Sequence, residues 1–403
     1  MTTQLAGAQR TQALPVAEVR PAGATRLLYI DNLRILLISM VIVIHVAVTY
    51  GVGGVWGYYK EEGEMNAAVV AIITLMGAVG TTFFMGFFFM IASYFTPRSY
   101  DRKGARMFLL DRLKRLGIPL LIYAVIIDAL IVYLREIYFG FRGLPWQLPG
   151  YKGIIPYFPG PMWFVEALLI LSILYAAWRL LTKRTPLPPP PPLDSEAKAP
   201  GNLSIALFAL AVGLVTFVVR IWAPVEWYFE PLHLEPASFA NYIALFVVGI
   251  VAYRRNWLAG LSDAQGKTWA WIAAGLFVVL VVVALASGAL TGSLDSELFG
   301  GLTALSLIYS VWQQLMCMAM VIILLVGFRR RFNHQGRLAK GMADSTYAVY
   351  ILHPLVIVPL AIVLSPIKMD MALKFILVAP VAVALCFLVG YAVRKLPLVR
   401  DVL

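Results

Sequence analysis

The chain has 403 residues, of which 61% are hydrophobic and only 13% are charged, and this composition excludes an ordinary soluble domain. The formal net charge is +12, but the basic residues fall in short connections between apolar stretches, which argues against a face that binds nucleic acid. Both cysteines, Cys317 and Cys386, lie inside apolar stretches, so we predict neither a disulfide framework nor a metal site. We therefore expect a polytopic protein of the lipid bilayer.

Residues 1–25 contain no apolar core, which predicts a mobile polar tail and not a signal peptide. Residues 26–403 are predicted to form a single transmembrane domain. Because a bilayer span needs about 20 apolar residues, the sequence predicts an all-α bundle of about ten spanning helices. The second apolar stretch is long and is interrupted by Gly77, Gly80 and Gly86, which favours a tilted or broken helix. The ten stretches lie near 28–50, 68–95, 116–135, 162–181, 203–222, 239–253, 268–288, 304–327, 345–365 and 372–393.

The distribution of basic residues predicts the orientation of the bundle. Lysines and arginines occur in every second connection, at 98–115, 183–198, 254–255, 329–340 and 394–400. Cytoplasmic loops carry such an excess, so we expect both termini in the cytoplasm. The proline-rich part of the cytoplasmic loop 183–202 is predicted to be a stiff spacer, and a ligand for a proline-binding partner is the alternative.

The first span carries two charged or titratable side chains, Arg34 and His45. They are separated by about three helical turns, or about 16 Å along the axis, so they share one helix face, which Asp31 joins. Ionisable groups inside spans usually face a cavity, a partner or a pathway, which favours an anion-binding role for Arg34 and acid–base chemistry at His45. The alternatives are an arginine that snorkels to the interface and a core histidine bonded to a backbone carbonyl.

The third span begins with Arg112 and Arg115, three residues apart on one predicted helix face. This pair is suited to hold a polyanionic cofactor, and a positively charged anchor at the cytoplasmic interface is the alternative. Asp128, near the middle of the same span, has no partner that the sequence identifies.

The fourth span opens with Trp163 and Glu166. Trp163 is well placed for the aromatic belt at the membrane interface. A carboxylate about one turn inside an apolar helix needs a partner or water, so Glu166 is expected to orient a base or a hydroxyl group. A hydrated carboxylate at the rim of the span is the alternative.

The ninth span places Tyr350 and His353 on one face, followed by Pro354. A proline inside a helix frees a backbone carbonyl and kinks the helix. His353 is expected to act as a proton partner, and a structural bridge between helices is the alternative.

In this order, these segments resemble the acyltransferase family 3 of integral membrane enzymes, and the resemblance covers nearly the whole chain. Within the family the chain looks most like the branch that decorates periplasmic glucans with succinyl groups, although it has Ala92-Ser93 where many members have Ser-Gly. The matching elements are Arg34 with His45, the aromatic segment 83–95, Arg112-Leu-Lys-Arg115, Trp163-Phe-Val-Glu166 and the segment from Ser345 to His353.

The resemblance implies transfer of a short acyl group, acetyl or succinyl, from cytoplasmic acyl-CoA to a hydroxyl of an extracytoplasmic carbohydrate. No tightly bound cofactor is expected, and the location implied is the bacterial inner membrane. His45 is implied to be the base or to carry the acyl group covalently, with Glu166 and His353 as further catalytic residues. Residues expected to hold the phosphates of acyl-CoA are Arg34, Arg112 and Arg115, and residues expected to bind substrate are Trp163, Tyr350 and Asp31.

A proton-coupled secondary transporter is the main alternative, because its intramembrane charges relay protons. Such transporters often contain inverted repeats, and the two halves of this sequence show no repeat that we detect.

Overall fold

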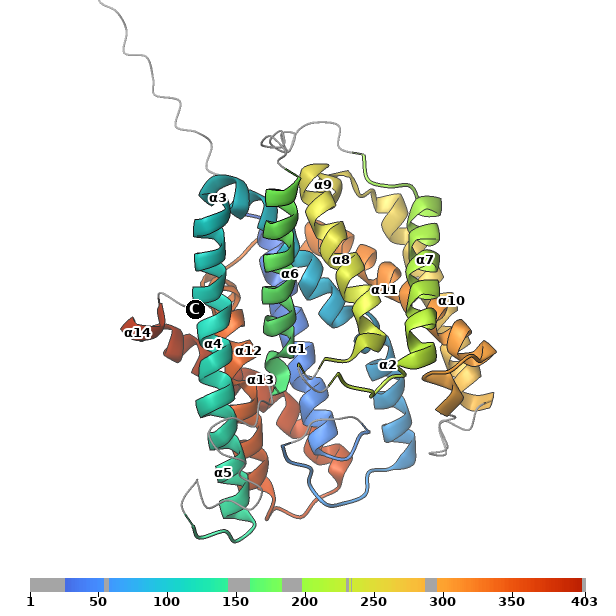
Figure 1. The fold of residues 1–403 in the computed structure, drawn as a ribbon. Coiled ribbons are helices and arrows are strands. Elements are labelled where there is room, and N and C mark those ends of the chain that lie inside the picture. The colour runs from blue at the N-terminus through green and yellow to red at the C-terminus, as the bar shows by residue number, and fades with distance from the viewer. Residues whose placement is uncertain are drawn as a thin grey trace, which may run out of the picture.

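The computed structural model describes residues 26–53, 58–143, 160–182, 198–229, 232, 234–286 and 296–400. The predicted tail and the proline run 186–192 of the 183–202 loop lie outside these residues. Across the described part, ten helical segments are long and apolar enough to span a membrane and no strand occurs, which confirms the all-α expectation (Figure 1). Nine of these segments are α1 Leu28–Thr49, α2 Ala67–Tyr94, α6 Trp163–Leu181, α7 Asn202–Trp222, α8 Pro236–Arg254, α10 Asp263–Ala286, α11 Ala304–Arg331, α12 Arg337–Leu364 and α13 Met371–Arg394.

The tenth segment is a composite rod that runs along one side of the bundle (Figure 1). It consists of α3 Thr96–Arg112, the π-helical turn η1 Leu113–Gly117, α4 Ile118–Ile122, the π-helical turn η2 Tyr123–Ile127 and α5 Asp128–Tyr138. Four short elements complete the fold: η4 Gly160–Met162, α9 Trp257–Gly260, η6 Ser296–Leu298 and α14 Pro397–Arg400.

Two helices begin well before the predicted boundary. The rod starts at Thr96 where hydropathy predicted residue 116, and α12 starts at Arg337 where it predicted residue 345. The N-terminal extensions of both helices are rich in basic residues, so a search for apolar stretches does not detect them. The first turns sharply at Gly104, whose φ of 71° lies in the left-handed region that glycine adopts without strain.

Of the two alternatives for the long second stretch, a tilted or a broken helix, the broken one is wrong, because α2 is continuous from Ala67 to Tyr94. Its glycines serve close packing: a Cβ on Gly86 would lie 2.6 Å from the Leu245 side chain of α8. In return, a Cβ on Gly249 of α8 would collide with the Ser93 hydroxyl and the Met90 carbonyl of α2. The Ala92-Ser93 pair therefore lies where α2 and α8 approach most closely.

Helix α1 is the central element of the bundle. Its side chains Leu33, Leu37, Ile42 and Val46 are all fully buried. Neighbouring helices α2, α11, α12 and α13 surround it. Because the chain crosses the bundle in alternate directions, one end of the bundle gathers the basic helix termini of α6, α8, α11 and α13. We call this the basic end and the other the far end.

At the far end, the segment that follows α1 is held against α13 by a buried ion pair. Lys374 Nζ lies 2.5 Å from Glu61 Oε1, and the two side chains are 2% and 6% exposed. The Lys374 ammonium also lies 5.7 Å from the centre of the Tyr50 ring. This pair fixes the α1–α2 connection against the first turn of α13.

Candidate functional site

Two histidines from helices distant in sequence meet in the interior of the bundle. His45 Nδ1 of α1 lies 3.0 Å from His353 Nε2 of α12. The imidazole rings are nearly parallel, with an interplanar angle of 9° and centroids 5.0 Å apart. His353 is fully buried. The structure thus brings together the predicted base and its predicted proton partner.

The sequence of α12 explains how His353 is oriented. Pro354 has no backbone N–H, so the carbonyl four residues earlier, that of Tyr350, loses its helical donor. His353 Nδ1 lies 2.6 Å from this carbonyl oxygen. A carbonyl only accepts, so Nδ1 carries the hydrogen and Nε2 presents its lone pair to His45.

An aromatic wall adjoins the histidine pair. Trp163, at the start of α6, is stacked on Tyr242 of α8 with ring centroids 5.4 Å apart. Phe164 packs edge-on against Tyr350 at 5.8 Å, and Tyr350 lies 5.9 Å from the His353 ring. The Tyr350 hydroxyl donates to the Pro161 carbonyl, which fixes the beginning of α6 against α12.

Glu166 follows this wall in the first turn of α6 and is 6% exposed. Three of the residues that the sequence singled out, Trp163, Tyr350 and His353, are thus linked by ring contacts through Phe164. Glu166 is buried on the same helix as Trp163, one turn deeper.

The carboxylate of Asp128 accepts a hydrogen bond from one phenol, Tyr58, which in turn contacts a second phenol, Tyr123. Tyr58, from the connection after α1, donates to Asp128 Oδ1 at 2.7 Å and lies 2.8 Å from the Tyr123 hydroxyl. Burial, together with these neighbours, raises the pKa of Tyr58, so its hydroxyl stays protonated as a donor. Gly160 packs directly against the Tyr58 and Tyr123 hydroxyls. Sequence reasoning missed Tyr58 because it lies in a connection with no helical periodicity.

At the basic end, Arg34 belongs to an ionic network. Its Nη1 lies 3.6 Å from Asp31 Oδ1, and Asp31 also pairs with Arg26 at 2.5 Å. Arg26 in turn lies 2.8 Å from Asp344 of α12, which Arg394 approaches at 3.7 Å. Asp31, expected to bind substrate, is thus engaged by two arginines, and Arg34 remains 35% exposed.

Arg112 and Arg115, predicted to lie on one helix face, have different surroundings in the structure. Arg112 donates to the Thr96 hydroxyl at 3.1 Å and covers the Phe108 ring at 5.2 Å. The Arg115 side chain is 62% exposed and pairs with Asp111 at 3.4 Å. The π-helical turn η1 begins between the two arginines and changes the rotation per residue. A prediction that assumes a regular α-helix does not include this change.

Helix α12 carries a polar residue at every third position from 344 to 353, and each contacts a different segment. Tyr347 donates to the Arg115 carbonyl at 2.8 Å, which Pro119 deprives of its helical donor. In an α-helix, side chains three residues apart point in directions that differ by about 60°. Four residues spaced in this way therefore cover about half of the helix circumference. The partners in order are Arg26 for Asp344, the Arg115 carbonyl for Tyr347, the Pro161 carbonyl for Tyr350 and His45 for His353.

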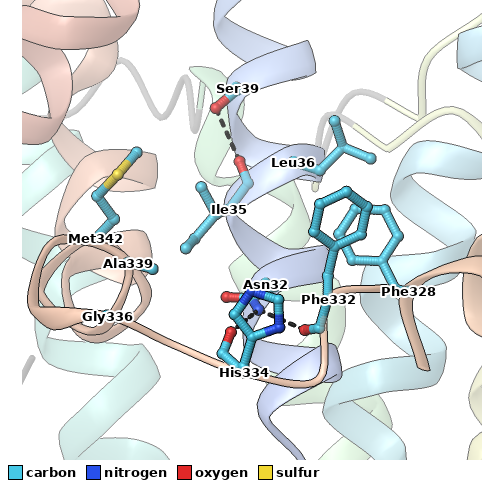
Figure 2. A pocket seen from close by; sticks show the side chains of 10 residues that line it. All are labelled: Asn32, Ile35, Leu36, Ser39, Phe328, Phe332, His334, Gly336, Ala339 and Met342. Atoms are coloured by element: carbon cyan, nitrogen blue, oxygen red, sulfur yellow. Dashed lines mark hydrogen bonds between the residues drawn. The ribbon is translucent and has the colours of Figure 1, made fainter. Parts of the chain in front are cut away.

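A groove of about 440 Å³ opens beside α1, between the end of α11 and the start of α12 (Figure 2). Asn32 lies at its base and donates to the Phe332 and His334 carbonyls at 2.6 and 3.0 Å. Ile35 and Ser39 line the groove from a helix face turned by about 110° from that of residues 34 and 45. The groove is therefore distinct from the histidine site.

Among the described residues, no three His, Cys, Asp or Glu side chains gather as a metal site requires. A search of curated proteins and a search of solved structures found no match to the chain. The family model described as an acyltransferase domain, Acyl_transf_3, matches residues 27–392, which include His45, His353 and nearly all of the ten spanning segments. The chain therefore belongs to the acyltransferase 3 family of membrane proteins.

Proposed function

We propose that the protein transfers a short acyl group, acetyl or succinyl, from acyl-CoA at the basic end to a hydroxyl group of a carbohydrate beyond the far end. The basic end is predicted to face the cytoplasm, by the excess of arginine and lysine in its connections, and the membrane is predicted to be a bacterial inner membrane. Family membership supports acyl transfer as the reaction. The contact of 3.0 Å between His45 and His353 is the observation that carries the proposal.

The hydrogen-bond chain supports His45 as a general base. Since the Tyr350 carbonyl accepts from His353 Nδ1, the lone pair of His353 Nε2 accepts from His45 Nδ1. His45 then carries its own lone pair on Nε2. A base whose tautomer is fixed by a second group that is itself oriented is the arrangement that activates hydroxyl nucleophiles.

In the proposed reaction, His45 Nε2 takes the proton of the acceptor hydroxyl while the hydroxyl oxygen attacks the thioester carbonyl carbon. The carbon–sulfur bond breaks, and the leaving thiolate takes the proton back from His45. The products are an O-acyl ester and free CoA, and the histidine pair returns to its starting tautomers. The bond from His45 to His353 strengthens while His45 is charged, which stabilises the transition state.

Other residues receive roles by position. Trp163 and Tyr350 belong to the aromatic wall, which suits the apolar face of a sugar ring, and Glu166 is proposed to orient the acceptor hydroxyl. Arg34, held by Asp31, is proposed to bind a phosphate of the donor from the basic end. Its distance from His45, about 16 Å along α1, is comparable to the length of a phosphopantetheine arm. Arg112 and Arg115 are proposed to contribute further positive charge that attracts the phosphates of the donor.

The test uses membranes that contain the full chain, incubated with radiolabelled acetyl-CoA or succinyl-CoA and a glycan acceptor. We expect label in the glycan, loss of transfer on His45→Ala at unchanged protein level, and full transfer on His334→Ala. His334 is a matched control, because it lines the groove at the basic end and not the histidine site. Flux of a substrate across vesicles with no acyl transfer would instead support the transporter and refute the proposal.

A further inference from the structure

A group of arginines at the basic end includes Arg112 and two residues to which the proposed reaction gives no role, Arg179 and Arg254. Arg179 Nη1 of α6 lies 3.3 Å from Asp101 Oδ1 of α3, and Arg254 of α8 bonds the other carboxylate oxygen. Arg112, also from α3, reaches the same region through aromatic rings. Its guanidinium covers Phe108, and Phe108 packs against Tyr100 at 5.5 Å.

The charges in this group do not balance. Arg179 and Arg254 share one ion-paired carboxylate, that of Asp101, which leaves one positive charge in excess, and Arg112 adds a charge that the neighbouring Asp111 carboxylate partly offsets. Arg179 is only 6% exposed, and the Nε atoms of all three arginines are buried without a hydrogen-bond partner in the described part of the chain. Buried polar groups are nearly always bonded, and a buried charge without compensation is costly. The arrangement is that of an anion site.

The surroundings of the arginines indicate the kind of anion. A guanidinium fork matches the oxygens of a phosphate, and three forks from different helices suit a ligand with more than one phosphate group. The Tyr100 ring lies 5.1 Å below the Arg179 guanidinium, and Tyr100 and Phe108 both pack against Tyr175. All three rings are buried beneath the guanidinium groups, so they hold the arginines in place at the basic end.

We infer that Arg112, Arg179 and Arg254 bind the phosphates at the nucleotide end of acyl-CoA, its 3′-phosphorylated ADP. The inference rests on the proposed function for the identity of the donor. Asp101 holds the Arg179 and Arg254 forks in place while the site is empty, and the phosphates replace it as their partner. Its side chain is 23% exposed, so the group can be reached from the basic end.

The test measures binding of adenosine 3′,5′-bisphosphate by titration calorimetry to the full chain in nanodiscs of neutral phosphatidylcholine. This probe has phosphate at two positions of the nucleotide but no thioester, so its binding does not depend on acyl transfer. Arg179→Lys and Arg254→Lys keep the charge and remove the fork, and we expect each to weaken binding about tenfold or more. Asp101→Asn removes the competing carboxylate, and we expect it to tighten binding.

Arg220 of α7 provides the matched control. It is 1% exposed, has an unpartnered Nε like the other three, and donates to Ser310 and Gln313, and its contacts in the described part of the chain include no second arginine. Arg220→Lys should therefore leave binding unchanged. The inference is overturned if the wild type does not bind the probe, if the Arg179 and Arg254 variants bind like wild type, or if Asp101→Asn only destabilises the fold.

The source of the phosphate is tested by adding anionic phosphatidylglycerol to the nanodiscs. Displacement of the probe by this lipid at a low molar fraction would assign the site to a lipid headgroup and overturn the inference. Binding of the probe by a protein that transfers no acyl group in the radiolabel assay would refute the proposed function and leave the nucleotide site intact. The two failures are thus distinguishable.

Discussion

Replacing His353 tests the central contact of the proposed site. His353→Leu keeps a buried side chain of similar size and removes the acceptor that faces His45 Nδ1 at 3.0 Å. His353→Gln keeps an acceptor, because a glutamine amide oxygen can take the place of the Nε2 lone pair. We expect His353→Leu to lose most activity and His353→Gln to recover part of it.

The magnitude follows from the hydrogen bond that each variant loses. In the proposed transition state His45 is an imidazolium, so its bond to His353 is charge-assisted and contributes about 1.5–3 kcal/mol. At about 1.4 kcal/mol for each factor of ten, His353→Leu should lower kcat by about 10- to 150-fold. The KM for the donor should change little, because donor contacts are proposed for arginines at the basic end.

The assay is initial-rate acyl transfer by purified protein, with thermal unfolding of each variant as the control for folding. A His353→Leu protein that is folded and retains kcat within about threefold of wild type would refute the relay. Equal loss in His353→Leu and His353→Gln would also count against it, because a purely structural role of the side chain would not distinguish an acceptor from an apolar group.

Three further substitutions test the supports of the site. Pro354→Ala restores a backbone donor that competes with the His353 ring for the freed carbonyl, so we expect kcat to fall about tenfold with little change in the unfolding temperature, measured by rate assay and fluorescence. Gly160→Ala forces a Cβ into the Tyr58 hydroxyl at a φ of 48°, and we expect a loss of at least about 1–2 kcal/mol in stability, measured by thermal unfolding. Lys374→Met leaves the buried Glu61 carboxylate without its cation and should cost about 3–5 kcal/mol, whereas Lys374→Met combined with Glu61→Leu should recover much of this loss in the same assay. Stability of Lys374→Met equal to wild type would show that the pair contributes nothing.

Hydropathy alone predicted the class and the number of spanning helices, because burying a helical backbone in lipid requires long apolar runs. It did not predict the beginning of the composite rod at Thr96, whose first turns are basic and lie outside any apolar window. The glycines of α2 suggested a break in the helix, and this prediction failed for another reason. Glycine weakens a helix in isolation, but here Gly86 allows α8 to approach, and packing outweighs propensity.

The site shows a similar division. The face shared by Arg34 and His45 follows from helical periodicity. Pro354 predicts a backbone carbonyl without a helical donor, and this carbonyl orients His353. The contact between His45 and His353 depends on the placement of α12 against α1, which a single sequence does not encode in any local pattern. Sequence analysis counted Arg254 only among the basic connections and did not single out Arg179, and their convergence on Asp101 distinguishes both from interfacial anchors.

The row of polar residues along α12 gives this helix a mechanical role. Asp344, Tyr347, Tyr350 and His353 tie this one helix to four separate parts of the molecule, from the ionic network at the basic end to the imidazole of α1. A helix transmits a small axial displacement over its whole length, because its backbone bonds resist compression. A displacement of α12 relative to α1 would therefore change the separation of the two imidazoles.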